Sequence, residues 1–600
     1  MPTLQQLNDA TDHEAVALLD GIYEHTPWVA QRAVASRPFR SLAHLAYALH
    51  AAVAAATREE QLALVRVHPE LGGRAMVAGT LTADSAAEQS RSGLTHCTPE
   101  EFARLRELNA TYSEKFGFPF ILAVGGPRGT GLGRAEIIAT LARRLESHPE
   151  VELAECLRNI DRIAELRLAQ RFGEVPEDGN WVWDRAEALA VHSDPPFAEA
   201  GQLTVTYLTE AHRACARDLA AWMREVGCDE VAIDAVGNVR GRYLATPGRP
   251  PAGTVYTGSH YDTVRNGGKY DGRLGILAPL AVVRRLKAAD RRLPFHLEVI
   301  AFAEEEGQRF PATFLGSSAL IGRFDSAWLD QVDAAGTSLR QAMIAAGLDP
   351  AGVAACRLDP SDALGFIEVH IEQGPVLEEL GLALGVVTSI NGSVRFAGEV
   401  TGLASHAGTT PMDRRRDAAL AVAELALQVE QRAAQDGDSV GTIGVLEVPA
   451  GSVNVVPGRC RFTLDLRAPE DGQRDRLVKD LLETLARICA RRGLRHRIEE
   501  TLRVAAAASD PVWQRRWEQA VESLGLPVHR LRSGAGHDAM KMHEAMPQAM
   551  LFVRGGNGGI SHNPLETITA HDAQRCVDAL DACLRQLARD MKEAFDDGRR

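Results

Sequence analysis

The apolar residues change their spacing after about residue 170, and this change limits what the chain can fold into. Before it they recur every three or four positions, as at Leu105, Leu108 and Tyr112, which is the period of an amphipathic helix. After it, strand-like runs such as 255–258 and 296–302 alternate with helical runs, an order typical of α/β proteins. We therefore expect an all-helical first part followed by an α/β part.

The domain boundaries follow from these patterns. A helix predicted over 151–168 closes the helical part, and the polar run after it indicates a linker. Between 392 and 505 the order is strand, helix, strand, strand, helix, strand, which is the split pattern of ferredoxin-like domains. The prediction is a multidomain chain with an all-α domain at 1–170, a linker at 171–182, an α/β domain at 183–391 and 506–600, and an inserted α+β domain at 392–505.

Composition argues against several classes of function. The 600 residues are too many for one core, and a formal net charge of −14 argues against nucleic acid as the main partner. The nine cysteines form no CxxC pair, which indicates a reducing compartment. The first twenty residues carry four acidic groups and no apolar core, and no run approaches the roughly 18 apolar residues of a membrane helix. We expect a cytoplasmic protein.

Potential metal ligands follow the predicted strands one after another. His260 and Asp271 lie in GSHYDTVRNGGKYDG, between a strand-like run and a helical run. Three adjacent carboxylates, 304–306, end the next strand-like run, and a bound cation is one physical reason to tolerate their repulsion. His370 follows from another run, and His562 lies in a glycine-rich turn. Such ligands suit zinc or manganese, and five of them shared by two ions need a bridge, for which Asp271 is the natural choice.

Three polar groupings stand out in the helical part. HPELGG at 68–73 interrupts a helical pattern, SAAEQ at 85–89 has the spacing of a capping box, and KFGFPF at 115–120 is an aromatic loop. Each has an ordinary structural explanation by itself, as a capping His-Pro, a helix start and a hydrophobic plug. Arg167, in the last predicted helix, could bind a carboxylate or simply face solvent.

Together these groupings resemble the OHCU (2-oxo-4-hydroxy-4-carboxy-5-ureidoimidazoline) decarboxylase family over nearly all of residues 1–170. The resemblance implies an all-helical, cofactor-free lyase of uric acid breakdown, in which His68 protonates the carbon that loses its carboxylate. The ring carbonyl and imine can accept the electrons of decarboxylation, so the protein need supply only positioning and a proton. The implied substrate-binding residues are Pro69, Ser85, Glu88, Gln89, Phe120, Ile121 and Val124.

The segments GSHYDTVRNGGKYDG, AEEEGQRF, EVHIEQGPVLE, SHAGTTPM, VNVVPG and GISHNP resemble the dinuclear metallopeptidase-like amidohydrolases, in the group of allantoate amidohydrolases and N-carbamoyl-L-amino acid hydrolases. The resemblance spans roughly residues 183–595. It implies two divalent ions, Mn²⁺ or Zn²⁺, held by His260, Asp271, Glu306, His370 and His562. Glu305 would be the general base, and Asp262 would orient the imidazole of His260.

The same resemblance gives the inserted domain a role as a lid and as the interface of a homodimer. It implies that Gln373, His406, Asn454 and Arg467 contact the substrate. The guanidinium of Arg467 suits a substrate carboxylate because it can bind both oxygens.

The two resemblances suggest one metabolic role. No spacing separates allantoate from N-carbamoyl amino acids as the hydrolase substrate, but the decarboxylase-like part favours allantoate. We therefore expect a bifunctional purine-catabolic enzyme that converts OHCU to S-allantoin and hydrolyses allantoate to ureidoglycine or ureidoglycolate, ammonia and CO₂. Allantoinase, which acts between these steps, is a candidate partner. Two alternatives stay open: an N-carbamoyl-L-amino acid hydrolase, and a non-catalytic helical part that docks allantoinase, against which His68, Glu88 and Gln89 argue.

Overall fold

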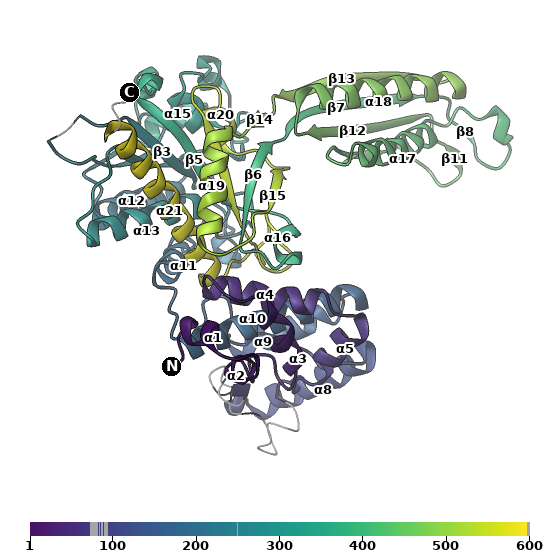
Figure 1. Ribbon diagram of the computed structural model, residues 1–600. Helices are drawn as coiled ribbons and strands as arrows, with labels where there is room; N and C mark the ends of the chain where they lie inside the picture. Colours follow the sequence, from purple (N-terminus) through teal and green to yellow (C-terminus); the bar gives the residue numbers. More distant parts are fainter. Residues whose placement is uncertain are drawn as a thin grey trace. The chain divides into compact units, whose positions relative to one another are not determined.

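The computed structural model describes residues 1–72, 82, 84, 85, 88, 90, 94–248 and 250–596. The chain forms two compact units (Figure 1). The first comprises Met1–Val386, Arg515–His529 and Leu551–Arg600, and the second Val387–Gln514 and Arg530–Met550. Among the described residues, none of the helices combines the length and the apolar character that a membrane span requires.

The first part of the first unit is helical, as the apolar period predicted. A capping box begins its helix α8 (Pro99–Phe116): the Glu101 N–H donates to the Thr98 hydroxyl, and the Thr98 N–H donates to the Glu101 carboxylate. The helix ends at Gly117, which adopts the left-handed conformation with a φ of 74°. The other α-helices in the described residues of this part are α1 (Leu4–Asp9), α2 (Asp12–Leu18), α3 (Pro27–Ala33), α4 (Leu42–Ala54), α5 (Arg58–Arg66), α9 (Arg134–Arg144) and α10 (Pro149–Phe172).

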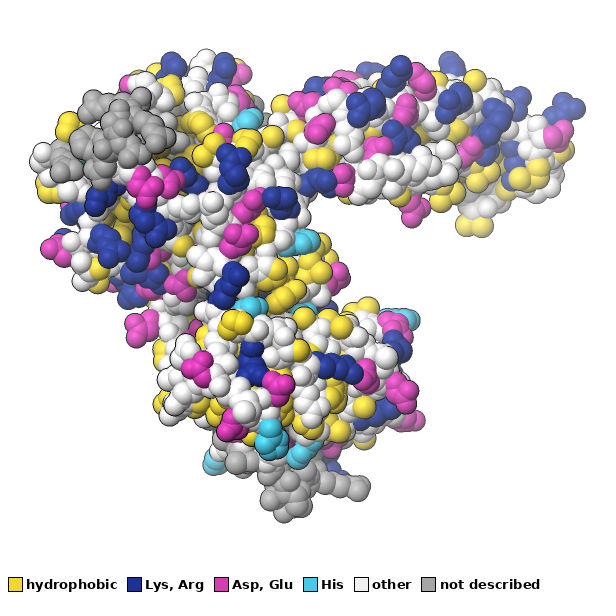
Figure 2. All heavy atoms as spheres, viewed as in Figure 1, with side chains coloured by type: hydrophobic (Ala, Val, Ile, Leu, Met, Phe, Trp, Pro, Cys, Tyr) yellow, Lys and Arg dark blue, Asp and Glu magenta, His cyan; other side chains and the backbone are white. Residues whose placement is uncertain are grey.

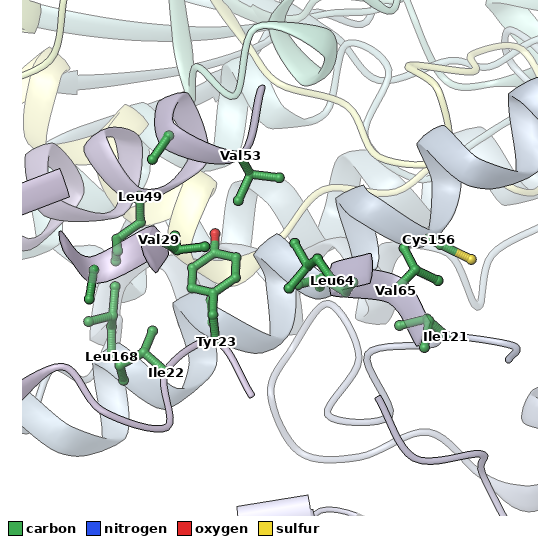
Figure 3. Close-up of a cluster of buried hydrophobic side chains, with 14 of the residues drawn as sticks. Ile22, Tyr23, Val29, Leu49, Val53, Leu64, Val65, Ile121, Cys156 and Leu168 are labelled. Carbon is green, nitrogen blue, oxygen red and sulfur yellow. The ribbon is translucent and has the colours of Figure 1, made fainter. Parts of the chain in front are cut away.

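Apolar side chains from these helices form one buried core. Figure 3 shows part of it, with Leu49 and Val53 of α4, Leu64 and Val65 of α5, and Leu168 of α10. None of these five side chains is more than 2% exposed. Their removal from water is the main favourable contribution to folding of this domain.

The second part of the first unit is built on a mixed sheet. Strands β3 (Thr254–His260), β4 (His296–Phe302) and β5 (Ala363–Ile371) run parallel at its centre. Strands β2 (Val239–Tyr243) and β1 (Glu230–Ile233) continue it antiparallel beyond β4. All residues of β3 are buried, as in a parallel sheet that is covered on both faces.

Helix α13 (Leu274–Ala288) follows β3 and covers the sheet. Eleven of its fifteen residues are buried, because it packs on β3, β4 and β5 and also contacts three other helices. These are α11 (Glu177–Leu189), α12 (Glu210–Val226) and α21 (Ala570–Asp596). The remaining α-helices among the described residues are α14 (Leu315–Leu320), α15 (Leu339–Ala345), α16 (Val376–Glu379), α17 (Ala418–Asp436), α18 (Asp471–Arg492), α19 (Pro511–Ser523) and α20 (Asp538–Met542).

The predicted linker at 171–182 is much shorter in the structure. Helix α10 continues to Phe172 and α11 begins at Glu177, so only 173–176 lie outside helices. The polar run was misleading because Glu177 and Asp178 occupy the first turn of α11, where acidic side chains are favoured by the helix dipole. Gly179 then lets α11 approach α21, since a Cβ there would lie 1.8 Å from the carbonyl oxygen of Ala570.

The second unit contains a five-stranded antiparallel sheet with α17 and α18 packed against it. The first of the two strands expected between the helices of the inserted domain is divided into two short strands, and the N–H of Val445 between them donates to the Thr463 hydroxyl at 3.1 Å. The strands of this sheet are β7 (Gly392–Thr401), β9 (Val440–Thr442), β10 (Leu446–Glu447), β12 (Arg459–Ala468) and β13 (Arg495–Val504). The other strands of the chain are β6 (Leu384–Ile390), β8 (Ser405–His406), β11 (Val455–Val456), β14 (Ala507–Ala508), β15 (Arg530–Ser533) and β16 (Gln548–Val553).

Candidate active sites

Parallel strands bring the metal-ligand candidates to one edge of the central sheet. β3 ends at His260, and β4 ends just before the acidic run 304–306. The register of β3 with β5 pairs Thr257 with Ile367, so His370 lies level with His260. The carboxyl ends of the parallel strands form the edge at which open α/β sheets bind their ligands.

Asp271 is at the centre of the cluster. Its Oδ1 lies 3.5 Å from Nε2 of His260 and 3.3 Å from Nε2 of His370, and its Oδ2 lies 3.1 Å from Nε2 of His562. The same His562 nitrogen is 3.6 Å from Oε1 of Glu306. Asp271 therefore belongs to two groups of potential ligands, one with His260 and His370 and one with Glu306 and His562. This is the arrangement that a bridging carboxylate needs.

The donor set fits two divalent ions. Each group places its ligand atoms within 4.8 Å of one another, and imidazole with carboxylate suits zinc or manganese. The Gly272 N–H donates to Nε2 of His370 at 3.1 Å, and Nδ1 of His370 donates to the carbonyl oxygen of Ile371 at 2.9 Å. Because Nδ1 carries the proton, Nε2 is the acceptor nitrogen, and a metal ion bound there would replace its hydrogen bond with the Gly272 N–H.

Burial and mutual charge shift the titration of the cluster. Burial lowers the pKa of His260, but hydrogen bonds to Asp262 and Asp271 outweigh it and raise that pKa well above its usual value. Burial, and then the charge of Asp271, raises the pKa of Glu306 to about 7. The hydrogen bond to Asp271 raises the pKa of His562 to about 9. A divalent cation would compete with protons for these atoms, so its affinity increases with pH.

Asp262 links His260 to the acidic run. Nδ1 of His260 donates to the backbone oxygen of Asp262 at 3.1 Å and lies 3.4 Å from its carboxylate. That carboxylate accepts the N–H groups of Glu305 and Glu306, each at 3.2 Å. The Glu305 carboxylate lies with His260 and Glu306 in a third group of potential ligands and is partly exposed. Asp262 thus orients both a ligand and the predicted general base.

Glu566 is a member of this cluster that sequence reasoning missed. One of its oxygens accepts the N–H groups of Tyr270 at 2.9 Å and Asp271 at 3.0 Å, and the other accepts the Ser561 hydroxyl at 2.7 Å. Its side chain is 4% exposed. Glu566 therefore ties the segment that carries Asp271 to the segment that carries His562. Its position four residues after His562 in GISHNPLE is the signal that could have found it.

The predicted substrate contacts belong to both units. In the first unit, the Gln373 amide donates to the Ser561 hydroxyl at 3.1 Å, next to His562. In the second unit, β8 and β11 pair His406 with Val455, and the Ala407 N–H donates to the carbonyl oxygen of Asn454 at 2.9 Å. His406 and Asn454 are therefore close to each other.

Arg467 already has a carboxylate partner in the second unit. Its Nε and Nη2 donate to the two oxygens of Asp465 at 3.0 and 2.9 Å, and its Nη1 donates to the carbonyl oxygen of Gly534 at 2.6 Å. The side chain has the forked geometry that carboxylate binding requires. A substrate carboxylate would have to share or replace Asp465.

A separate pocket of about 30 Å³ lies inside the helical domain. Among the predicted site residues, Gln89 falls outside the described part of the chain. The pocket gathers the others, namely His68, Pro69, Ser85, Glu88, Phe120, Ile121 and Val124. These residues come from three segments that the sequence pattern treated separately, and the fold places them around one space.

Arg167 also lines this pocket and is only 5% exposed, so the solvent-facing alternative is wrong. It donates to both oxygens of Glu88 at 2.8 and 3.0 Å, to Glu24 at 3.2 Å and to the Ser85 hydroxyl at 3.2 Å. Burial raises the pKa of Glu24, but hydrogen bonds from Thr82 and Ser85 and the charge of Arg167 give a net lowering. No sequence pattern marked Glu24, which follows α2 in an irregular segment.

His68 faces the pocket with a defined tautomer. Its Nδ1 donates to the carbonyl oxygen of Leu64 at 2.9 Å, which leaves Nε2 as the acceptor nitrogen. Burial lowers the pKa of His68, so the imidazole is neutral near pH 7. A neutral, buried imidazole with one free lone pair is suited to take up a proton and return it.

Two family models match the chain: OHCU decarboxylase over residues 8–169 and peptidase family M20/M25/M40 over residues 256–586. An N-carbamoyl-L-amino acid amidohydrolase of Geobacillus stearothermophilus is 38% identical over 411 residues, which cover 68% of this chain and 98% of that relative. An allantoate deiminase of Arabidopsis thaliana is 36% identical over 423 residues, which cover 65% of this chain and 79% of that relative. The solved structure of an amidase of the hydantoinase/carbamoylase family from Burkholderia multivorans matches with a TM-score of 0.63 at 32% identity. The match covers 68% of this chain and 97% of that amidase.

Proposed function

Because this chain belongs to peptidase family M20/M25/M40 and also contains an OHCU decarboxylase domain, as predicted, we propose that it is a bifunctional enzyme of purine catabolism. It converts OHCU to S-allantoin at the His68 pocket and hydrolyses allantoate at the cluster around Asp271. The products of the second reaction are ureidoglycine or ureidoglycolate, ammonia and CO₂. The observation that carries this proposal is that one chain gathers both sets of site residues, each in its own domain.

In the decarboxylase pocket, His68 supplies the proton and Arg167 the positive charge. An anionic substrate would raise the pKa of His68, because a nearby negative charge favours the imidazolium. Nε2 can then deliver a proton to the carbon from which CO₂ departs. The apolar side chains of Phe120 and Ile121 line the same pocket, where an ionised carboxylate is poorly solvated. The substrate ring accepts the electrons, so the proposed reaction needs no cofactor.

In the hydrolase site, two divalent ions would polarise the ureido carbonyl and lower the pKa of a water molecule. Glu305 takes a proton from the attacking water and passes it to the departing nitrogen. Asp262 holds the backbone of Glu305 in place for this transfer. Gln373, His406, Asn454 and Arg467 are the proposed substrate contacts. The carbamoyl carbon leaves as carbamate, which decays to ammonia and CO₂.

A second candidate function is hydrolysis of N-carbamoyl-L-amino acids. It is favoured by the 38% identity to the amidohydrolase of Geobacillus stearothermophilus, against 36% to the allantoate deiminase. Incubation of the pure, manganese-loaded protein with each substrate, followed by an ammonia assay, separates the two. Turnover of N-carbamoyl amino acids alone would contradict the assignment of allantoate. Metal analysis of the active protein decides between Mn²⁺ and Zn²⁺, because this ligand set accepts both.

The inserted domain is proposed to form the lid and the interface of a homodimer. Large apolar side chains are exposed on the second unit, and Figure 2 shows hydrophobic surface there. Leu403, Met412 and Leu427 are each more than 60% exposed, and such a surface favours association. Sedimentation of the intact chain and of a Leu427→Glu variant would test this, since only the variant should be monomeric. Allantoinase is the proposed partner that converts the first product into the second substrate.

A further inference from the structure

His562 depends on an irregular loop for its position. The His562 loop, defined here as residues 555–569, connects β16 to α21. His562 has a φ of 54°, in the left-handed region that few non-glycine residues adopt, and its side chain is 52% exposed. His260 and His370, in contrast, lie on strands and are buried. Contacts that hold this loop therefore have a direct effect on one metal-ligand candidate.

An ion pair closes the base of the loop. Arg554 donates to both oxygens of Asp572, with distances between 2.8 and 3.1 Å. The Thr569 hydroxyl donates to the same carboxylate at 2.8 Å, and the Gly556 N–H donates to the carbonyl oxygen of Thr567 at 2.8 Å. Asp572 is almost fully buried, so its charge must be compensated by these partners.

The helical domain joins this network through Glu165 of α10. The Glu165 carboxylate accepts hydrogen bonds from Arg162 at 2.6 Å and from Arg575 of α21. Arg575 also reaches Asp572 at 3.4 Å. Nη2 of Arg554 also lies 4.0 Å from Oε1 of Glu165, so Glu165 faces both arginines that pair with Asp572. Without the charge of Glu165, we expect Arg575 to pair more closely with Asp572 and to compete with Arg554 for it. The charge of Glu165 thus keeps Asp572 available to close the loop.

A second contact from α10 reaches the loop itself. Arg158 pairs with Glu378 of α16 at 3.2 Å, and the same Glu378 oxygen accepts the Gly558 N–H at 2.7 Å. Arg158, Arg162 and Glu165 are spaced by four and three residues and therefore lie on one face of the helix. α10 also carries Arg167, which lines the decarboxylase pocket, so one helix contributes to both regions.

We propose that Glu165 and Arg158 of the helical domain are positioning residues for the metal centre of the hydrolase domain, acting through the base and the backbone of the His562 loop. This goes beyond the proposed reactions, although it rests on the proposed metal centre. The match to the Geobacillus relative covers 98% of that relative but only 68% of this chain. About a third of this chain therefore lies outside the match. The α10 contacts come from the OHCU decarboxylase domain, which the family model matches at residues 8–169.

The test compares Glu165→Gln with the unchanged chain, both as full-length protein. Glu165→Gln keeps the size of the side chain and removes its charge. Affinity for Mn²⁺ is measured by competition with a chelator, and the ligand geometry by the visible spectrum of the cobalt-substituted protein. We expect about tenfold weaker binding, at the lower end of what outer-shell changes cause, together with an altered cobalt spectrum. S-allantoin formation should be unchanged, since Glu165 does not line the decarboxylase pocket.

Asp184→Asn is the matched control. This substitution removes the ion pair between Arg128 and Asp184, whose Nε and Oδ1 atoms lie 2.8 Å apart. The pair also joins the helical domain to the α/β domain, but it does not involve the His562 loop. Its metal affinity and cobalt spectrum should equal those of the unchanged chain. An effect as large as that of Glu165→Gln would show that domain docking in general, and not the loop contact, is responsible.

Arg158→Met provides an independent variant if Glu165→Gln loses decarboxylase activity and so fails to fold. It should weaken metal binding in the same direction, because Glu378 loses its counter-charge. Normal affinity and an unchanged spectrum in the folded variants would overturn the proposal. If the unchanged chain releases no ammonia from allantoate, the substrate assignment fails, while the affinity and spectral measurements still decide the role of Glu165.

Discussion

The decarboxylase pocket and the metal-ligand cluster both bury charged side chains, but they balance charge differently. In the pocket, Arg167 lies between Glu24 and Glu88 and bonds to both, so the cation and its partners are paired inside the protein. In the cluster, the carboxylates of Asp271 and Glu306 lie close together, and the pKa of Glu306 rises to about 7. The pocket pairs one guanidinium with two carboxylates, whereas in the cluster the carboxylates lie next to imidazoles, where a divalent cation would neutralise their charge.

The two regions also differ in how their residues are supported. Strand ends place His260 and His370, so the central sheet directly sets two of the five ligand candidates. The decarboxylase pocket is assembled from helix ends and loops that are distant in the sequence. Substitutions in loops should disturb a site less when strands hold part of it than when helix ends and loops form all of it. The two activities should therefore respond separately to metal removal and to substitution.

Metal removal should separate the regions most strongly. Dialysis against a chelator is expected to reduce ammonia release from allantoate to background and to leave S-allantoin formation unchanged, because only the cluster has metal-ligand chemistry in the proposed mechanism. Both products are measured on the same protein before and after dialysis, and Mn²⁺ or Zn²⁺ is then added back. A parallel loss of both activities would contradict the independence of the sites.

Substitution of His68 should have the opposite selectivity. We expect His68→Asn to reduce the rate of S-allantoin formation by about 10²–10⁴-fold, the usual contribution of a general acid or base. Circular dichroism of the chiral product measures this rate, and ammonia release from allantoate serves as the control. Stereoselective product formation at the original rate would exclude His68 as the proton donor.

Acid should weaken the contact between the helical domain and α21, which includes the hydrogen bond between Arg162 and His571. Burial lowers the pKa of His571, which accepts a hydrogen bond from Arg162, from 6.5 to about 4. Between these pH values the unfolded chain binds more protons than the folded chain. The contribution of His571 to the free energy of unfolding is therefore fully present above pH 6.5 and decreases as the pH falls. The difference between these two pKa values corresponds to about 3 kcal/mol in the free energy of unfolding.

His571→Asn is the comparison for this effect, because its amide oxygen can still accept from Arg162 but does not titrate. Denaturant unfolding of both proteins between pH 7 and pH 4 should show the unchanged chain losing more stability than the variant. Two curves that stay parallel over this range would show that His571 is not the group responsible.

Glu566 should give the smallest effect of the four, confined to the hydrolase. Glu566→Ala removes the acceptor that joins the segments of Asp271 and His562, and we expect metal affinity to fall by about 10–100-fold. Glu566→Gln should be milder, since its amide oxygen can still accept the N–H groups of Tyr270 and Asp271. Chelator competition measures both variants, and equal affinities for Ala and the unchanged chain would remove Glu566 from the ligand framework.

Much of the hydrolase site was predictable because its ligands adjoin buried strands. A short run of β-branched and aromatic residues such as Thr254–Thr257 predicts a strand, and the residues that follow a parallel strand lie at the ligand-binding edge of the sheet. The exact geometry of the loops is not needed for this argument. Glu566 was missed because it binds backbone N–H groups 295 and 296 residues away, and no local pattern records such a contact.

The decarboxylase pocket was predictable only through its resemblance to a known family. His68, Ser85 and Phe120 each had an ordinary local explanation, and nothing in the helical period indicated that they face one another. The predicted linker was wrong for a related reason: the acidic start of α11 has the composition of a loop, and its burial against α21 depends on residues almost 400 positions later.

By itself, the sequence determined the class of each domain and the residue types of both sites, because helical and strand periods and ligand chemistry are local properties of the chain. Only the tertiary structure decided which charges pair. Arg167 meets Glu24 across 143 positions, and Arg575 meets Glu165 across 410. The energy of such pairs depends on distance and burial, and both are set by how the helices pack.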